Sequence, residues 1–121
     1  MKIALLGYGR MGKAIEKIAV ERGHQIVLKI AKKTDLIDLT TADVAIDFSI
    51  PETAFYNITS SINLGVPIVS GTTGWLDKYD EVVELCKEKK GAFIYASNFS
   101  LGVNIFFEIN KKLAKLMANY T

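Results

Sequence analysis

The chain has 121 residues, half of them apolar, so it can bury the core of one domain and is not a disordered segment. Its fifteen basic and thirteen acidic residues are interspersed and give a net charge of +2, which indicates no surface for nucleic acid or a membrane. No window approaches the roughly twenty apolar residues of a membrane span, and the N-terminus lacks the pattern of a signal peptide. The single cysteine, Cys86, lies in the apolar phase of a helical stretch, which indicates a buried structural thiol and a reducing, cytoplasmic location.

Short β-type runs alternate with amphipathic helical stretches along the chain. In order, the predicted strands and helices are Lys2–Leu6, Gly12–Arg22, Gln25–Ile30, Asp43–Asp47, Pro51–Leu64, Pro67–Ser70, Leu76–Lys89, Ala92–Tyr95 and Leu101 to about Asn119. The runs IALL, VAI and FIY lack polar alternation, which is typical of strands covered on both faces. The alternation predicts an α/β fold, a doubly wound Rossmann-type parallel sheet with helices on both faces, as a single domain over residues 1–121. Ligands of such sheets bind at the carboxyl ends of the strands, so we expect the functional residues in the loops there.

The first strand runs into the loop LLGYGRMG, in which Gly7, Gly9 and Gly12 have the spacing G-x-G-x-x-G. Between a strand and a helix, these glycines allow a tight turn, approach of a pyrophosphate to the backbone, and close packing of helix on strand. The helix N-terminus adds N–H donors and a positive dipole end. The loop therefore predicts dinucleotide binding.

The second strand ends in the sequence KIAKKT. Lys32 and Lys33 stand where an acidic residue usually meets a free adenosine ribose, and Asp35 comes slightly late. Ammonium groups favour a 2′-phosphate, and Arg10 in the glycine loop adds a second cation, so NADPH is favoured over NADH. Ordinary surface lysines and use of both cofactors stay open. The lone His24 is interpreted as a surface turn residue at the edge opposite the ligand crevice.

The third and fourth strands end in DFSIP and SGTTGW. Ser49 and Glu52 form an S-x-x-E capping box with Pro51 in the first turn of a helix. Phe48 either packs against the ribose or nicotinamide of a cofactor or belongs to the core. The stretch Gly71–Gly74 can bring backbone amides and carbonyls close to a flat polar ring such as a nicotinamide carboxamide, or can be a purely structural turn.

The fifth strand leads into ASNFSLGVN, where Asn98 or Ser100 can cap the helix that begins near Leu101. That helix has a wide apolar face, and no Gly or Asn cap follows it. Its apolar residues are Leu101, Ile105, Phe106, Phe107, Ile109, Leu113, Leu116, Met117 and Tyr120. We expect the helix to lead toward a further domain.

Taken together, GYGRMG, DFS followed by PE, GTTG and SNFSLGVN resemble the N-terminal domain of dihydrodipicolinate reductase, now called 4-hydroxy-tetrahydrodipicolinate reductase. The resemblance covers essentially the whole chain. It implies that the pyrophosphate is held by Gly7, Tyr8, Gly9, Arg10, Met11 and Gly12. It places Lys32 and Lys33 near the adenosine ribose. The nicotinamide pocket is implied to be formed by Phe48, Ser49, Gly71, Thr72, Thr73, Ala96, Ser97, Asn98 and Phe99.

The family reduces a cyclic, unsaturated dicarboxylate to tetrahydrodipicolinate by hydride transfer from NADPH or NADH, in lysine and diaminopimelate biosynthesis. It typically forms homotetramers. Many members have one more residue in the glycine loop, which puts the phosphate contacts here in doubt. The family's catalytic segment, with paired histidines, a lysine and a Ser-Gly-Thr anion site, is not found, since His24 is the only histidine.

We therefore expect the NAD(P)-binding domain of a two-domain enzyme, without its C-terminal substrate-binding and catalytic domain. No catalytic acid or base and no metal site are assigned to it. Two alternatives stay open on the fold alone: a stand-alone nucleotide-binding or sensing module, and the cofactor domain of another amino-acid-pathway reductase, such as one acting on a semialdehyde.

Overall fold

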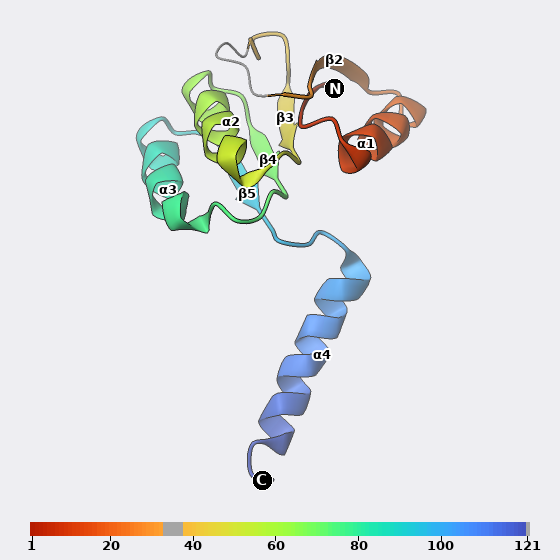
Figure 1. Ribbon diagram of the computed structural model, residues 1–121, viewed down its shortest axis with the longest axis vertical. Coiled ribbons are helices and arrows are strands. Elements are labelled where there is room, and N and C mark those ends of the chain that lie inside the picture. The colour runs from red at the N-terminus through yellow and green to blue at the C-terminus, as the bar shows by residue number, and fades with distance from the viewer. Residues whose placement is uncertain (33–37, 121) are drawn as a thin grey trace.

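The computed structural model describes residues 1–32 and 38–120, which form an open parallel sheet, flanking helices and a projecting terminal helix (Figure 1). The sheet has five strands in the order β2-β1-β3-β4-β5, and every neighbouring pair is parallel. The elements are β1 (Lys2–Leu6), α1 (Arg10–Glu21), β2 (Gln25–Ile30), β3 (Val44–Asp47), α2 (Pro51–Asn63), β4 (Ile68–Ser70), the 3₁₀ turn η1 (Leu76–Lys78), α3 (Tyr79–Glu88), β5 (Phe93–Tyr95) and α4 (Leu101–Met117). The predicted doubly wound α/β fold is confirmed.

The two faces of β1 bury alternate residues because side chains alternate along a strand. Ala4 and Leu6 pack into the larger core, which α2 and α3 cover, whereas Ile3 and Leu5 pack with Ala19 of α1 on the opposite face. Both sets are almost completely buried. An apolar strand without polar alternation is thus covered on both sides, as its sequence predicts.

All carboxyl ends of the strands lie at one edge of the sheet because the strands are parallel. The first and third strands are paired from Ile3 with Val44 to Leu6 with Asp47, which brings the loops that follow them side by side. His24 lies at the opposite edge, in the turn between α1 and β2, with its Nδ1 3.3 Å from the N-terminal amine. Its predicted position away from the crevice is confirmed.

The sequence predicts one continuous helix from 76 to 89. The structure instead has a 3₁₀ turn followed by α3. The tight turn follows Trp75, which is 2% exposed, and Trp75 Nε1 donates to the carbonyl of Thr72 at 2.7 Å. This anchor sets the path by which the chain enters α3. Cys86 is a free, half-buried thiol on α3 and packs against the larger core.

The terminal helix α4 projects away from the sheet and its covering helices (Figure 1). Ser100 caps it, as expected, by accepting a hydrogen bond from the Val103 amide at 3.4 Å, and Asn98 Oδ1 accepts one from the Ser100 amide at 2.7 Å. No residue of α4 is buried. Among the described residues, no helix combines the length and apolar character needed to cross a membrane.

Candidate functional site

The loop after β1 contains two glycines at positions where a side chain has no room. Gly7 has φ +99°, a left-handed conformation that favours glycine, and a Cβ there would overlap the backbone carbonyl of Phe48. A Cβ on Gly12 would overlap the backbone carbonyl oxygen of Gly7, so a glycine there lets α1 begin close to the end of β1. Gly9 is the N-cap residue of α1 and faces open space. The first turn of α1 therefore offers N–H donors and a positive dipole end beside Gly9.

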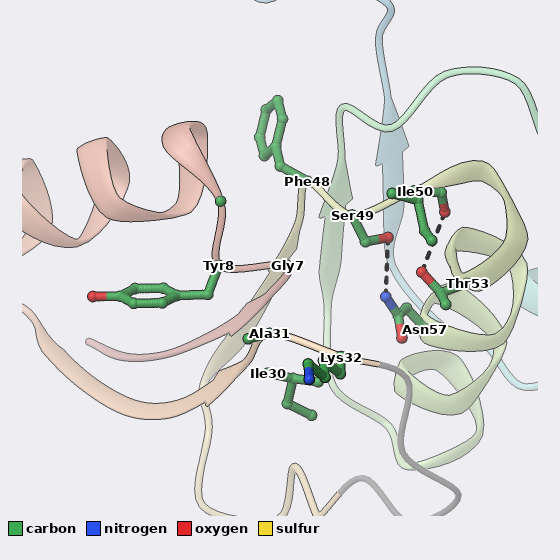
Figure 2. Close-up of a pocket in the computed structure, with 11 residues that line it drawn as sticks. Gly7, Tyr8, Ile30, Ala31, Lys32, Phe48, Ser49, Ile50, Thr53 and Asn57 are labelled. Atoms are coloured by element: carbon green, nitrogen blue, oxygen red, sulfur yellow. Dashed lines mark hydrogen bonds between the residues drawn. The ribbon is translucent and has the colours of Figure 1, made fainter.

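Tyr8 anchors this loop with a side chain that points away from Ser49 and Asn57 (Figure 2). Its hydroxyl donates to Glu16 on α1, and Lys29 on β2 lies 3.0 Å from the same carboxylate and 5.0 Å from the centre of the Tyr8 ring. The Tyr8 hydroxyl, and after it the Lys29 ammonium, lower the pKa of Glu16, while the hydrogen bond to Glu16 raises the pKa of Tyr8. Tyr8 therefore offers its backbone, rather than its hydroxyl, to the space beside the loop.

A pocket of about 240 Å³ opens beside the glycines, and we call it the glycine-loop pocket (Figure 2). It is formed by the loop after β1, the end of β2 and the start of α2, and it is lined by Gly7, Tyr8, Gly9, Ile30, Ala31, Lys32, Phe48, Ser49, Ile50, Thr53 and Asn57. Lys32 is exposed and brings a positive charge to this pocket. Lys33 and Asp35, also considered from the sequence, lie outside the described residues.

Two further hollows continue along the carboxyl edge of the sheet. The threonine-loop pocket, of about 240 Å³, is lined by Met11, Phe48, Ser49, Pro51, Gly71, Thr72 and Thr73. The hinge pocket, of about 530 Å³, is lined by Met11, Ile15, Ile46, Phe48, Val69, Ser97, Asn98, Phe99 and Ser100. All three hollows share Phe48, and the threonine-loop and hinge pockets also share Met11.

Phe48 lines all three hollows. A Cβ on Gly71 would overlap its ring, and the ring centre lies 6.5 Å from that of Phe99 in an edge-on arrangement. Within the described residues, Phe48 belongs to neither core cluster. Of the two roles that the sequence left open, the geometry favours a wall of the pockets over a core residue.

The predicted capping box at the start of α2 is wrong. A capping box joins the N-cap residue with the third residue of the helix. The N-cap residue is Ile50, which has no side-chain cap, so Ser49 lies one residue before the cap and Glu52 is the second helical residue. Pro51 is the first helical residue, as expected. The Ser49 hydroxyl instead donates to Asp47 Oδ1 at 2.7 Å, and this bond to a buried carboxylate takes the place of the cap.

Asp47, predicted from the sequence only as the last residue of a strand, is the centre of a buried hydrogen-bond network. Its Oδ1 accepts from Ser49 Oγ and from Asn57 Nδ2, the latter at 2.8 Å. Its Oδ2 accepts from Ser70 Oγ and Thr72 Oγ1, each at 2.8 Å. The signal in the sequence was a carboxylate at the end of an apolar strand, followed by hydroxyl residues in this loop and the next.

Most residues predicted for the site line at least one of these three hollows. Arg10 and Ala96 line none of the three, although Arg10 is exposed at the first turn of α1. Gly12 is buried in the packing of α1 on the loop and supports its shape. Ser97, Asn98 and Phe99 meet Met11 and Phe48 across the hinge pocket, although they are distant in the sequence.

The parallel sheet, its helices on both faces and the hollows near the carboxyl ends of its strands define the chain as an α/β domain of Rossmann type. Solved structures agree: a protein of Archaeoglobus fulgidus assigned as a homoserine dehydrogenase matches with a TM-score of 0.63 and 15% identity, over 78% of this chain and 42% of that one. A hyperthermophilic archaeal homoserine dehydrogenase in complex with NADPH matches with a TM-score of 0.58 and 14% identity, over 78% and 43%. These likenesses concern the fold alone.

Within this class, the chain belongs to the family described as dihydrodipicolinate reductase, N-terminus, whose model matches residues 1–99. It is 58% identical over 119 residues to the 4-hydroxy-tetrahydrodipicolinate reductase of Christiangramia forsetii, covering 97% of this chain and 50% of that enzyme. The chain spans about half the length of the curated relatives it matches. The family match ends just before α4 begins.

Proposed function

We propose that this chain is the NAD(P)H-binding domain of a 4-hydroxy-tetrahydrodipicolinate reductase of lysine and diaminopimelate biosynthesis. The observation that carries the proposal is the 58% identity to a reductase of that name over nearly the whole chain. In the proposed reaction, bound NADPH or NADH supplies a hydride to a cyclic dicarboxylate, giving tetrahydrodipicolinate. The substrate site and the catalytic acid or base are proposed to belong to a C-terminal domain, and the whole enzyme to be a homotetramer.

The glycine loop fits a dinucleotide. The open space at Gly9 gives a pyrophosphate access to the backbone at the N-terminus of α1, where N–H groups and the helix dipole favour an anion. We propose that Gly7, Tyr8, Gly9, Arg10, Met11 and Gly12 hold this group, with Gly7 and Gly12 shaping the loop and the others facing the phosphates.

The two halves of the cofactor are proposed to lie on opposite sides of the glycine loop. The adenosine half is proposed near Lys32 and Lys33, because an ammonium favours a 2′-phosphate, so NADPH is the preferred cofactor. The nicotinamide half is proposed to meet Phe48, Ser49, Gly71, Thr72, Thr73, Ala96, Ser97, Asn98 and Phe99. The role of these side chains is to hold the ring so that its hydride faces the acceptor, since correct positioning supplies much of the rate enhancement of such reactions.

We also propose a cytoplasmic location for the protein, which the free thiol of Cys86 supports.

The test is a fluorescence titration of the chain with NADPH and with NADH. Saturable binding of at least one cofactor is expected, with the tighter binding for NADPH. The control is Gly9→Asp, which places a side chain and a negative charge against the pyrophosphate and should abolish binding. Undetectable affinity for both cofactors at millimolar concentration would remove the assignment.

A further inference from the structure

Asp47 lies between the loops that follow β3 and β4, and its side chain is completely buried. Within the described residues, it is the one charged side chain in that state. Burying a carboxylate costs free energy unless an opposite charge or hydrogen bonds compensate. In residues 1–32 and 38–120, no basic group forms an ion pair with Asp47, so hydrogen bonds from neutral groups carry the compensation.

Those bonds come from the two loops and from α2. Ser49 belongs to the loop after β3, Ser70 and Thr72 to the end of β4 and its loop, and Asn57 to α2. A carboxylate that accepts two bonds at each oxygen has its acceptor sites filled. Three elements that are separate in the sequence are therefore fixed relative to one another by a single side chain.

The network also sets the direction in which the hydroxyls donate. Ser49 and Thr72 give their protons to Asp47, and Thr72 Oγ1 accepts the Ser49 backbone N–H at 2.8 Å. Both residues line the threonine-loop pocket. The hydroxyls can therefore present only lone pairs there, which match a donor such as the NH₂ of a carboxamide or a ribose hydroxyl.

We propose that Asp47 is a positioning residue for the nicotinamide half of the cofactor. By binding Ser49, Ser70, Thr72 and Asn57, it holds the loops after β3 and β4 in register and orients the Ser49 and Thr72 hydroxyls as acceptors. The proposal rests on the proposed function, because it takes the dinucleotide as the ligand. It assigns the adenosine half a weaker dependence on Asp47. Ser49 and Asn57 also line the glycine-loop pocket, but Lys32, the cation there, follows β2 on the other side of β1.

The experiment uses Asp47→Asn, which keeps the shape of the side chain but replaces one acceptor with a donor. Binding of NADPH and of adenosine 2′,5′-bisphosphate, which lacks the nicotinamide, is measured for the whole chain. The variant is expected to bind NADPH about tenfold more weakly or worse, and the bisphosphate within about twofold of the original chain. At saturation, the fluorescence of bound NADPH is expected to shift toward that of the free cofactor, because its ring is held less firmly.

Two further variants keep the proposal falsifiable if Asp47→Asn does not fold. Ser70→Ala removes one donor to Asp47 from a residue that lines none of the three hollows, and it should show the same selective loss for NADPH in weaker form. Asp43→Asn is the matched control. Asp43 directly precedes β3, at the end of the strand opposite to Asp47, and its carboxylate accepts a hydrogen bond from the Lys2 amide at 2.6 Å. It should leave the affinity for both ligands unchanged.

The outcomes separate this inference from the proposed function. Equal weakening of NADPH and of the bisphosphate by Asp47→Asn or Ser70→Ala would show a purely structural role and overturn the inference. Unchanged affinity for NADPH would overturn it as well. Failure of the unaltered chain to bind either NADPH or NADH would instead overturn the proposed function.

Discussion

The glycines in the loop after β1 meet different physical constraints. At Gly7 and Gly12 a Cβ would overlap backbone atoms of the protein itself, so these two positions concern the folded state. At Gly9 a Cβ would meet nothing within 4 Å, and its φ of −88° is accessible to any residue. A glycine that the fold does not require is best explained by a ligand that approaches it.

This difference predicts a separation of stability from binding. Gly12→Ala should lower the free energy of unfolding by about 1–3 kcal/mol, because the added methyl group forces α1 away from the loop. Gly9→Ala should change it by less than about 1 kcal/mol, yet weaken NADPH binding about tenfold by blocking a charge-assisted hydrogen bond to the pyrophosphate. Urea unfolding and cofactor titration of both variants measure the two quantities. A Gly9→Ala chain with unaltered affinity would contradict the proposed pyrophosphate position.

Lys32 lines the glycine-loop pocket, and we propose that its ammonium group distinguishes NADPH from NADH. Lys32→Ala should weaken NADPH binding about fivefold, because the 2′-phosphate loses an ionic partner, and leave NADH binding within about twofold. The matched control is Lys17→Ala, which removes an exposed lysine from α1. Competitive titrations at two salt concentrations check the result, and the difference between the variants should shrink at the higher one. An equal loss for NADPH and NADH would speak against a 2′-phosphate contact.

At the scale of elements, the Tyr8–Glu16–Lys29 cluster connects the loop after β1, α1 and β2. The pKa of Glu16 is lowered below its ordinary value of 4.5, by the Tyr8 hydroxyl first and then by Lys29. A carboxylate with a lowered folded pKa stabilises the protein above its unfolded pKa, and this contribution is lost as the pH falls through the folded pKa. The cluster should therefore stabilise the domain at neutral pH and cease to do so in acid.

The corresponding variant is Glu16→Gln. The unaltered chain should be more stable than Glu16→Gln by a constant margin between about pH 6 and pH 8, and the margin should narrow below about pH 4.5. Urea unfolding across this range measures it. Glu84→Gln is the control, since the Glu84 side chain is 76% exposed and, among the described residues, its ion-pair partner is Lys87 on the same helix, which is 69% exposed. A margin as large at pH 3 as at pH 7 would mean that Glu16 acts through packing rather than through its charge.

The order and type of the elements could be predicted because they depend on local patterns. The strands β1 and β2 begin and end at the predicted residues, and Ser100 caps α4 as its position suggests. The failed capping box at Ser49 has the opposite origin. Its hydroxyl binds Asp47, whose burial depends on the pairing of β3 with β4 and on the packing of α2, and neither is visible in a local pattern. The same long-range pairing explains why the Asp47 network was not predicted. The sequence contains each of its residues, but it does not show that they lie together.

At the scale of the whole molecule, the domain and α4 differ in how they are held. The sheet and the helices α1, α2 and α3 share buried cores, whereas α4 has no buried residue and exposes large apolar side chains, including Leu101 at 76% and Leu116 at 73%. In water, a helix gains most of its stability from packing of its apolar face, and an unpacked helix of this length is marginal. Its sequence also contains Gly102 and several β-branched residues, which are weak helix formers.

We therefore predict that, in the isolated chain, the amides of α4 exchange with solvent at nearly unprotected rates, while those of central α2 are protected to the limit of global unfolding. Hydrogen exchange followed by NMR measures both in one sample. A chain ending at Ser100 should keep the same unfolding temperature to within about 2 °C, because no residue of α4 is buried against the domain. Protection of α4 equal to that of α2 would show that its apolar face is covered in solution. Sedimentation of the two chains would then tell a second copy from contact within one molecule, since only the former would give the longer chain a larger mass that vanishes on dilution.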